Sequence, residues 1–214
     1  MSISLSWQSN YKTLNRFNRY PYSDIVSKVL KYKKKNHIAL DLGCGGGNHS
    51  EFLSKEFKIV YAIDESDEAI RLTKKRIKIK KNAFVCKFKE IPKKFDNYFG
   101  MMIDRASITH NKISEIEKTI PIIKKKLKKN GILISTFWSH NCTDVKFGKK
   151  IKDEKFSFEK FKKGNFMHSP ITTFLTKKKL INLFKNFKIC EIQVNNYAIK
   201  STRTEEFIIV VKKN

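Results

Sequence analysis

The stretch His37-Ile-Ala-Leu-Asp-Leu-Gly-Cys-Gly-Gly-Gly47 decides the fold of this chain. Its apolar first half, His37–Leu42, predicts a short buried strand that carries one acid. Four glycines lie in its second half, and a helical pattern begins at Asn48. Glycine adopts positive φ and lets a ligand approach the backbone closely. A strand, a glycine turn and a helix in this order therefore predict a ligand-binding turn.

Strands and helices continue to alternate along the chain. Further strands are expected at 58–63, 83–88, 98–103 and 132–138, and helices at 48–57, from 66, from 114 to 130 and at 176–184. Two closing strands, 189–194 and 206–211, leave no room for a crossover helix between them and must be antiparallel. The pattern predicts a doubly wound α/β fold around a parallel sheet.

The helix expected from residue 114 carries three local signals. Ser114 and Glu117 have the spacing of a capping box, and Asn130-Gly131 forms a stop after a lysine-rich turn. Pro121 lies inside the pattern and is expected to kink or split the helix.

One domain, 1–214, is expected, with additions at its periphery. In the N-terminal cap, residues 1–35, aromatic residues recur every three or four positions over 7–17. Two interpretations stay open: a helix packed on the domain, or a lid whose Trp7, Tyr11 and Arg19 reach the ligand.

A second addition covers residues 139–170. It shows no clear period and is expected to form a long loop, interpreted as an insertion on the substrate side.

The composition restricts the class of protein. An apolar content of 40% with 17 Phe excludes a disordered chain. The four cysteines lie far apart without a CxxC pair, which argues against a zinc site or a disulfide framework, and no metal is expected. No apolar run approaches the roughly 18 residues of a membrane span, and the first residues lack the apolar core of a signal peptide. A cytoplasmic location is therefore expected.

The net charge of +26 raises the question of a nucleic-acid partner. Of 46 basic residues, six are Arg and 46 − 6 = 40 are Lys, and the lysines are spread over nearly every expected helix. Specific phosphate and base recognition usually enlists Arg, whose planar fork forms paired hydrogen bonds. A solvated basic surface is therefore favoured over a nucleic-acid interface.

Three acids are expected at the carboxyl ends of strands. Asp41 lies near the end of the first strand, Asp64 after the second and Asp104 after the fourth. Ligands of such sheets bind at this edge, so the acids are expected around one crevice; helix capping is the alternative role. Asp64 follows Gly45 by 64 − 45 = 19 residues, the separation at which a carboxylate accepts hydrogen bonds from ribose. An acid ahead of the glycines suits a cationic nucleoside without phosphate.

At these residues the chain resembles the class I S-adenosylmethionine-dependent methyltransferases. The matching residues are Asp41-Leu-Gly-Cys-Gly-Gly-Gly47, Asp64 after the second strand and Asn130-Gly-Ile-Leu133 before the fifth. The resemblance implies a Rossmann-like doubly wound sheet of seven strands with an antiparallel last strand, and S-adenosyl-L-methionine as cofactor. It implies cofactor contacts from Asp41, Gly43, Cys44, Gly45, Gly47, Asp64, Glu65, Glu90 and Asp104. Among these, Asp64 would hold the ribose, and Glu90 takes the position of the polar adenine contact.

The segment after the fourth strand bears on the methyl acceptor. It reads Asp104-Arg-Ala-Ser-Ile-Thr-His110 and lacks the Asn/Asp-Pro-Pro-Tyr/Phe signature of enzymes that methylate amino groups of nucleic-acid bases. It looks more like the branch that acts on sugars and other metabolites. Asp104 or His110 is a candidate for removing a proton from the acceptor. The alternative for His110 is an ordinary residue at a helix entry.

The leading hypothesis is thus a methyltransferase for the O- or N-methylation of a small molecule. An RNA methyltransferase is the first alternative, because of the net charge and the basic 146–163 segment. A binding module that keeps the cofactor turn without catalysis is the second. An NAD-dependent dehydrogenase is disfavoured because GxGxxG and a second domain are missing.

Overall fold

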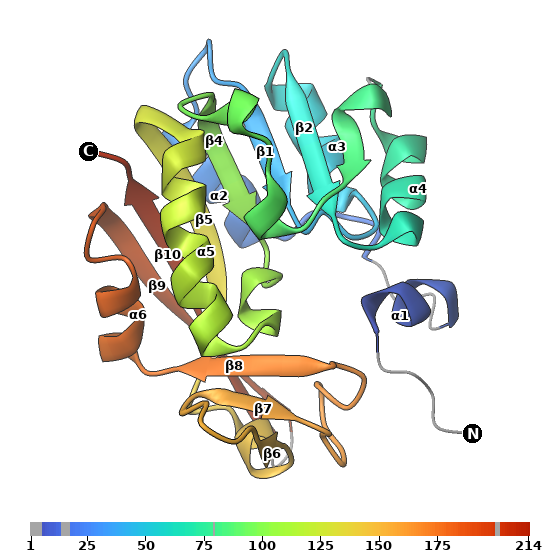
Figure 1. The fold of residues 1–214 in the computed structure, drawn as a ribbon, viewed down its shortest axis with the longest axis vertical. Coiled ribbons are helices and arrows are strands. Elements are labelled where there is room, and N and C mark those ends of the chain that lie inside the picture. The colour runs from blue at the N-terminus through green and yellow to red at the C-terminus, as the bar shows by residue number, and fades with distance from the viewer. Residues whose placement is uncertain (1–5, 14–17, 79, 200–201) are drawn as a thin grey trace.

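The computed structural model describes residues 6–13, 18–78, 80–199 and 202–214. A seven-stranded sheet in the order β3-β2-β1-β4-β5-β10-β9 forms its core (Figure 1). The first five of these strands run parallel, and β10 runs antiparallel between β5 and β9. The predicted doubly wound α/β sheet with an antiparallel last strand is therefore confirmed. The bounds are β1 Ala39–Leu42, β2 Val60–Asp64, β3 Ala83–Val85, β4 Phe99–Asp104, β5 Leu127–Ser139, β9 Lys188–Ile199 and β10 Thr202–Lys212.

Helices cover both faces of this sheet (Figure 1). The α-helices are α1 Trp7–Thr13, α2 Ser23–Tyr32, α3 Asn48–Glu56, α4 Asp67–Arg76, α5 Ile113–Lys126 and α6 Lys177–Leu183. Short 3-10 helices are η1 Lys80–Asn82, η2 Phe88–Glu90, η3 Lys93–Phe95, η4 Ile108–His110 and η5 Thr143–Lys146.

Strand β10 shows how the two layers are built. Phe207, Ile209 and Val211 pack in the cluster under α5 and α6, whereas Ile208 and Val210 pack with α2 and α3 on the other face. This alternation follows from the two-residue period of a strand. Each face of the sheet is buried, which explains the apolar runs that made the strands recognisable in the sequence.

Helix α5 corrects two predictions, and it excludes a split at Pro121. No capping box forms, because Ser114 bonds to Glu154 through both its backbone N–H (3.2 Å) and its hydroxyl. The helix ends at Lys126 rather than at the predicted stop at residues 130–131, and β5 begins directly after it. The helix runs unbroken through Pro121. That residue is exposed, so water can bond to the carbonyl that its missing N–H leaves free.

Residues 139–170 do not form the predicted structureless loop. They contain η5 and two short strands, β6 Lys149–Lys150 and β7 Ser157–Glu159, which join β8 Ile171–Leu175 in an antiparallel extension. β8 runs parallel to the end of β5 and so connects this extension to the main sheet. A small apolar cluster that includes Phe158, Phe161 and Phe166 holds the segment together.

Two smaller predictions also change. The third strand ends at Val85 rather than Phe88, because the chain turns into η2. The helical face predicted over 7–17 is a helix from Trp7 to Thr13, and residues 14–17 lie outside the described residues. Within the described parts of the chain, no helix combines the length and apolarity needed to cross a bilayer.

Candidate active site

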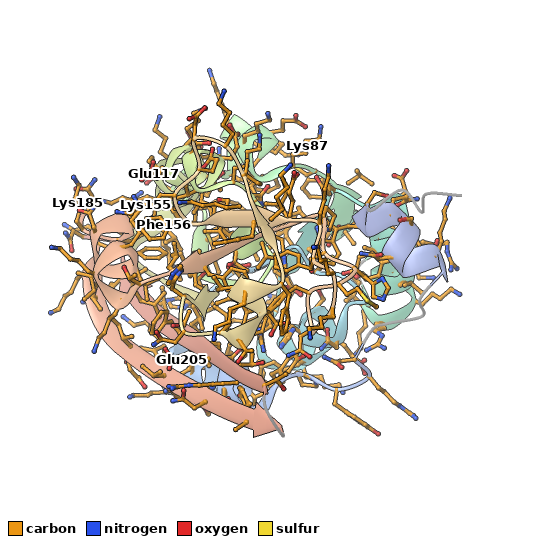
Figure 2. The ribbon with its side chains drawn as sticks, turned by 90° about the horizontal axis from the view of Figure 1, so that it is seen from below. Lys87, Glu117, Lys155, Phe156, Lys185 and Glu205 are labelled. Atoms are coloured by element: carbon orange, nitrogen blue, oxygen red, sulfur yellow. The ribbon has the colours of Figure 1, made fainter. Side chains whose placement is uncertain are left out.

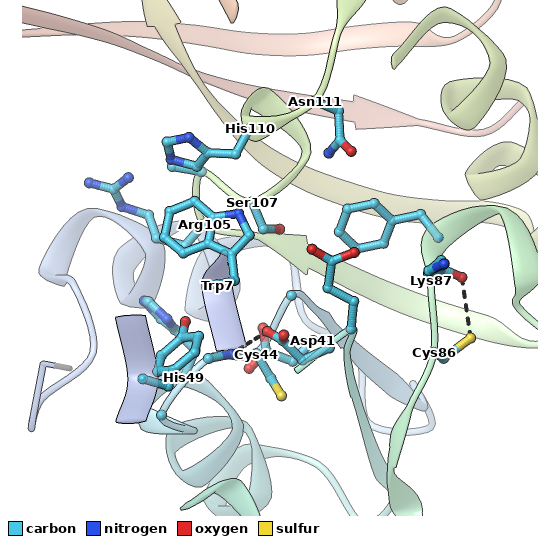
Figure 3. A pocket seen from close by; sticks show the side chains of 18 of the residues that line it. Trp7, Asp41, Cys44, His49, Cys86, Lys87, Arg105, Ser107, His110 and Asn111 are labelled. Atoms are coloured by element: carbon cyan, nitrogen blue, oxygen red, sulfur yellow. Dashed lines mark hydrogen bonds between the residues drawn. The ribbon is translucent and has the colours of Figure 1, made fainter. Parts of the chain in front are cut away.

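A cavity of about 400 Å³ lies at the carboxyl ends of β1, β2 and β4 (Figure 3). The sheet order reverses between β1 and β4, and this switch point is where ligands bind in doubly wound sheets. Sequence-predicted residues that line the cavity are Asp41, Gly43, Cys44, Gly45, Asp64, Glu65 and His110. Gly47, Glu90 and Asp104 are not among its lining residues.

The glycine turn forms the floor of the cavity. Gly43, Gly45 and Gly47 have φ of 63°, 53° and 81°, all in the left-handed region. A Cβ atom on Gly43 would lie 2.3 Å from the Cβ of Ser107, and one on Gly47 would lie 2.8 Å from the Cα of Thr73. These positions therefore need glycine both for backbone conformation and for close packing against the segments after β4 and within α4.

The substitution Gly43→Ala is expected to lower the free energy of unfolding by about 2 kcal/mol, because it adds a clash to a left-handed conformation. Urea denaturation measures this loss. Gly46→Ala is the control, since Gly46 is not among the glycines with positive φ. A Gly43→Ala protein as stable as the control would contradict the role assigned to Ser107 as a close neighbour.

Asp64 connects the glycine turn to the end of β2. Its two carboxylate oxygens accept hydrogen bonds from the backbone N–H groups of Gly45 (3.0 Å) and Ser66 (2.9 Å). Burial raises the pKa of the Asp64 carboxyl. The side chain therefore fixes the turn and at the same time faces the cavity.

Asp41 is a second acid in the cavity wall. It is buried and accepts a hydrogen bond from the Ser50 hydroxyl at 2.6 Å. The pKa of the Asp41 carboxyl is raised to about 7, mainly by burial and also by the nearby carboxylates of Asp64 and Asp104, against the opposing effect of the Ser50 hydrogen bond. A cation bound next to Asp41 would stabilise its ionised form.

Asp104 has a structural position. Its side chain is fully buried and accepts hydrogen bonds from the backbone N–H groups of Ser107 (2.8 Å) and Ile108 (3.0 Å) and from the Ser135 hydroxyl. These bonds fix the turn before η4. The sequence predicted Asp104 as a cofactor contact and a catalytic candidate, but Asp104 is not among the residues that line the cavity.

His110 does face the cavity. Its Nδ1 lies 3.1 Å from the carbonyl oxygen of Ile171 and 3.1 Å from the hydroxyl of Thr172. A carbonyl only accepts, so Nδ1 carries the proton and Nε2 keeps its lone pair. The pKa of His110 is lowered to about 4, mainly by burial and also by the Arg105 cation, against the opposing effect of the Ile171 carbonyl. His110 is therefore neutral near pH 7.

Helix α1 covers one side of the cavity. Trp7 and Tyr11 line it, and the Trp7 ring meets the His110 ring edge-on with centroids 4.8 Å apart. Gln8 anchors the helix, because its side-chain oxygen accepts a hydrogen bond from the Ser66 hydroxyl at 2.6 Å. Two of the three residues of the lid interpretation thus reach the cavity; Arg19 does not line it.

Arg105 is a cavity residue that the sequence analysis left without a role. Its guanidinium lies 4.1 Å from the ring centroid of Tyr22 and 5.5 Å from that of Trp138, and it pairs with Glu206 at 2.9 Å. Arg105 and Trp138 lie at the carboxyl ends of β4 and β5. Applying the rule for ligand sites to every basic and aromatic residue at those ends would have found both.

His49 is the other histidine in the cavity wall. Its Nε2 accepts a hydrogen bond from the Tyr22 backbone N–H at 3.2 Å, which gives this side chain a structural role. Burial lowers its pKa to about 3, so this ring is also neutral. Among the described residues, no group of His, Cys, Asp and Glu side chains is arranged to hold a metal ion.

The chain matches the methyltransferase domain family over residues 33–193, and it belongs to that family. Solved structures share its fold. An S-adenosylmethionine-dependent methyltransferase from Methanosarcina mazei has a TM-score of 0.71 at 21% identity, over 91% of this chain and 98% of that one. Another S-adenosylmethionine-dependent methyltransferase, from Anabaena variabilis, has a TM-score of 0.72 at 15% identity, over 97% of this chain and 92% of that one. The chain therefore has a methyltransferase domain with the fold of S-adenosylmethionine-dependent methyltransferases.

Two curated relatives carry more specific names. A probable cobalt-precorrin-6B C(15)-methyltransferase (decarboxylating) of Methanocaldococcus jannaschii is 33% identical over 112 residues, which is 52% of this chain and 58% of that protein. A ubiquinone biosynthesis O-methyltransferase of Pelagibacter ubique is 33% identical over 144 residues, 59% of this chain and 57% of that protein. The chain thus spans a little over half the length of these relatives.

The residues present fit S-adenosylmethionine. Gly43, Gly45 and Gly46 of the glycine turn line the cavity. The pKa of the buried Asp41 is raised, and the positively charged methionine part would stabilise the ionised form of this carboxyl. After β3, Phe88 lines the cavity and offers an aromatic surface for a nucleobase.

Proposed function

We propose that this protein transfers the methyl group of S-adenosylmethionine to an oxygen or nitrogen atom of a small molecule. One observation supports this proposal most strongly. A single cavity joins the acid-and-glycine turn to a chamber walled by Trp7, Trp138 and His110. Its size of about 400 Å³ suits small ligands rather than a polymer. The names of the two curated relatives also concern small-molecule methylation.

Each part of the wall has a proposed task. Asp64 holds the ribose hydroxyls, and Asp41 with the glycine turn faces the cationic methionine part. The bound cofactor supplies an electrophilic methyl group. His110 receives the proton of an acceptor hydroxyl on Nε2 as the new bond to carbon forms and the bond from carbon to sulfur breaks. Helix α1 covers the reacting atoms and keeps water away, so positioning supplies most of the acceleration.

Incubation of the protein with methyl-labelled S-adenosylmethionine and a cell extract tests the proposal. We expect label in a small-molecule fraction. Label confined to RNA would instead support the alternative of an RNA methyltransferase. A protein that binds the cofactor and labels nothing in any extract would support a binding module.

The basic surface does not favour the RNA alternative. The net charge is +26, but nitrogen-tipped side chains project from all sides, with Lys185 and Lys87 far apart in the view (Figure 2). Counterion release from a bound polymer needs cations gathered along its path. We therefore expect RNA binding to be weak and lost at physiological salt, as measured by filter retention over a salt series.

The affinity for S-adenosylmethionine is expected to rise about tenfold from pH 6 to pH 8. With a pKa of about 7, the ionised fraction of Asp41 rises about tenfold over this range, and the cation binds the ionised form. In the free protein, ionisation of Asp41 has the opposite effect, because it lowers the stability of the fold as the pH rises. The folded state holds the proton more tightly than the unfolded state, so the contribution of Asp41 to stability falls from about pH 4 to 7.

Isothermal titration calorimetry at pH 6, 7 and 8 measures this dependence. Asp41→Asn is the matched control, because it keeps an oxygen for the Ser50 hydroxyl and cannot ionise. The ratio of wild-type to Asp41→Asn affinity removes the titration of the ligand itself. A ratio independent of pH would show that Asp41 does not face the cation.

A further inference from the structure

A second cavity, of about 470 Å³, forms a groove between helices α5 and α6. The two helices lie side by side on one face of the sheet (Figure 1). This groove and the active-site cavity have no described lining residue in common. Lys213 of the groove follows β10, which runs antiparallel to β5, and so lies near the amino end of β5. The groove therefore extends toward the edge of the sheet opposite the active site.

The floor of the groove is apolar. Ile120 and Phe187 are 3% and 7% exposed, and Leu183 is half-buried. The lining residues of α5 run from 117 to 124, which corresponds to a length of roughly 10 Å at 1.5 Å per residue. About three residues of an extended chain, at roughly 3.3 Å each, span this length.

The rim of the groove is basic. Its four lysines are Lys124, Lys125, Lys185 and Lys213. None of them forms an ion pair with a carboxylate in the described parts of the chain. Glu117 is the only acid among the described lining residues, and it pairs with Lys179 of α6. The chain thus leaves the positive charge of this rim without an acidic partner.

Two of these lysines are held by neutral oxygen atoms. The ammonium group of Lys213 donates to the side-chain oxygen of Asn97 (2.8 Å) and to the carbonyl of Leu127 (2.7 Å). The ammonium group of Lys124 donates to the carbonyl of Asn186. The pKa of Lys213 is lowered, mainly by burial and also by the Lys124 cation. An anion bound between them would relieve this repulsion, and two side chains that are already fixed lose little freedom on binding it.

Floor and rim together restrict the chemistry of the ligand. A phosphate ion would use the lysines and leave the apolar floor empty. A bilayer is flat, and floor side chains as buried as Ile120 and Phe187 do not insert into it. A second copy of the chain would bring the same lysines and a net charge of +26. A peptide segment with an apolar side chain between acids fits both the floor and the rim.

We propose that this groove is a docking site for an acidic segment of another protein. An apolar side chain of the segment lies on the floor, and the carboxylates that flank it pair with the lysines of the rim. The net charge of +26 accelerates the encounter, because opposite charges steer association. Since the groove shares no described lining residue with the active-site cavity, the partner leaves that cavity open.

Three synthetic peptides that carry the same neutral dye test the proposal. The first has two leucines flanked on each side by two glutamates. Glutamines replace the glutamates in the second, and serines replace the leucines in the third. Fluorescence anisotropy at physiological salt measures their binding to the full chain. We expect the first peptide to bind at least tenfold more tightly than either of the others, because it alone uses both floor and rim.

The variant K125E/K185E reverses two exposed charges of the rim. We expect it to bind the first peptide at least tenfold more weakly than wild type, and to bind a leucine peptide with flanking lysines more tightly. K75E/K78E is the matched control, because it makes the same change of net charge at exposed lysines outside the groove. It should bind the first peptide within twofold of wild type. L183S removes part of the floor and should abolish the preference for leucine over serine.

Equal binding of the first and third peptides would overturn the inference, because net charge alone would then account for the attraction. Equal losses in K125E/K185E and K75E/K78E would do the same. Binding to phosphatidylglycerol vesicles that K125E/K185E abolishes, without binding of the peptide, would overturn it in favour of a membrane surface. These outcomes leave the proposed function untouched, since none of the measurements involves the cofactor.

Discussion

The substitution Asp64→Ala is expected to lower the affinity for S-adenosylmethionine at least a hundredfold. The carboxylate is proposed to accept two hydrogen bonds from the ribose. Bonds to a charged group contribute at least about 1.5 kcal/mol each, and two of them correspond to roughly a hundredfold in affinity. The substitution also weakens the glycine turn, because the N–H groups of Gly45 and Ser66 lose the carboxylate that accepts their hydrogen bonds.

Isothermal titration calorimetry with S-adenosylmethionine measures the loss. Asp64→Asn keeps one acceptor oxygen without the charge, so an intermediate affinity is expected. Asp67→Ala is the control, since it removes an exposed acid at the start of α4, outside the cavity wall. If folded Asp64→Ala protein bound the cofactor within threefold of wild type, the proposed ribose contact would be wrong.

The cofactor side of the site was predictable from the sequence for a physical reason. In a parallel sheet the carboxyl ends of the strands meet at one edge, so residues that end strands become neighbours. The glycine turn lies next to β1, and Asp64 ends β2. Both are local signals in the chain, and strand order alone brings them to one cavity.

The same rule predicted that Asp104 faces the ligand, but Asp104 does not line the cavity. It ends β4 as expected, but its side chain turns back to accept the N–H groups of Ser107 and Ile108. An acid at a strand end can face the ligand or cap the following turn, and the sequence is the same in both cases. The choice depends on packing that only the folded chain shows.

Long-range pairs account for most of what the sequence missed. Glu154 bonds to the first turn of α5 from 40 residues away, so the local capping box at Ser114 was a false signal. Arg105 finds its partner Glu206 on β10, across a separation of 101 residues (206 − 105). In residues 139–170 the strands have only two or three residues. Such strands are too short to show a two-residue period.

The two histidines of the cavity lead to the second large effect. His110→Ala is expected to lower kcat by a factor of about a hundred to a thousand, the range of a lost general base. His49→Gln should leave kcat close to that of wild type. The two variants are expected to differ because the lone pair on Nε2 is engaged in His49 and free in His110. Nε2 of His49 already accepts the Tyr22 N–H, whereas Nε2 of His110 has no hydrogen-bond partner among the described residues.

A structural role for His110 predicts a different outcome. Its Nδ1 bonds to Ile171, so His110→Ala also loosens β8 from η4, and thermal stability falls in either case. Added imidazole separates the two roles, because it can accept the acceptor's proton and cannot restore that strand contact. We expect imidazole to restore part of kcat in His110→Ala, and wild-type kcat/KM to fall at low pH with a pKa of about 4. Lost activity without rescue would assign His110 to the support of β8 instead.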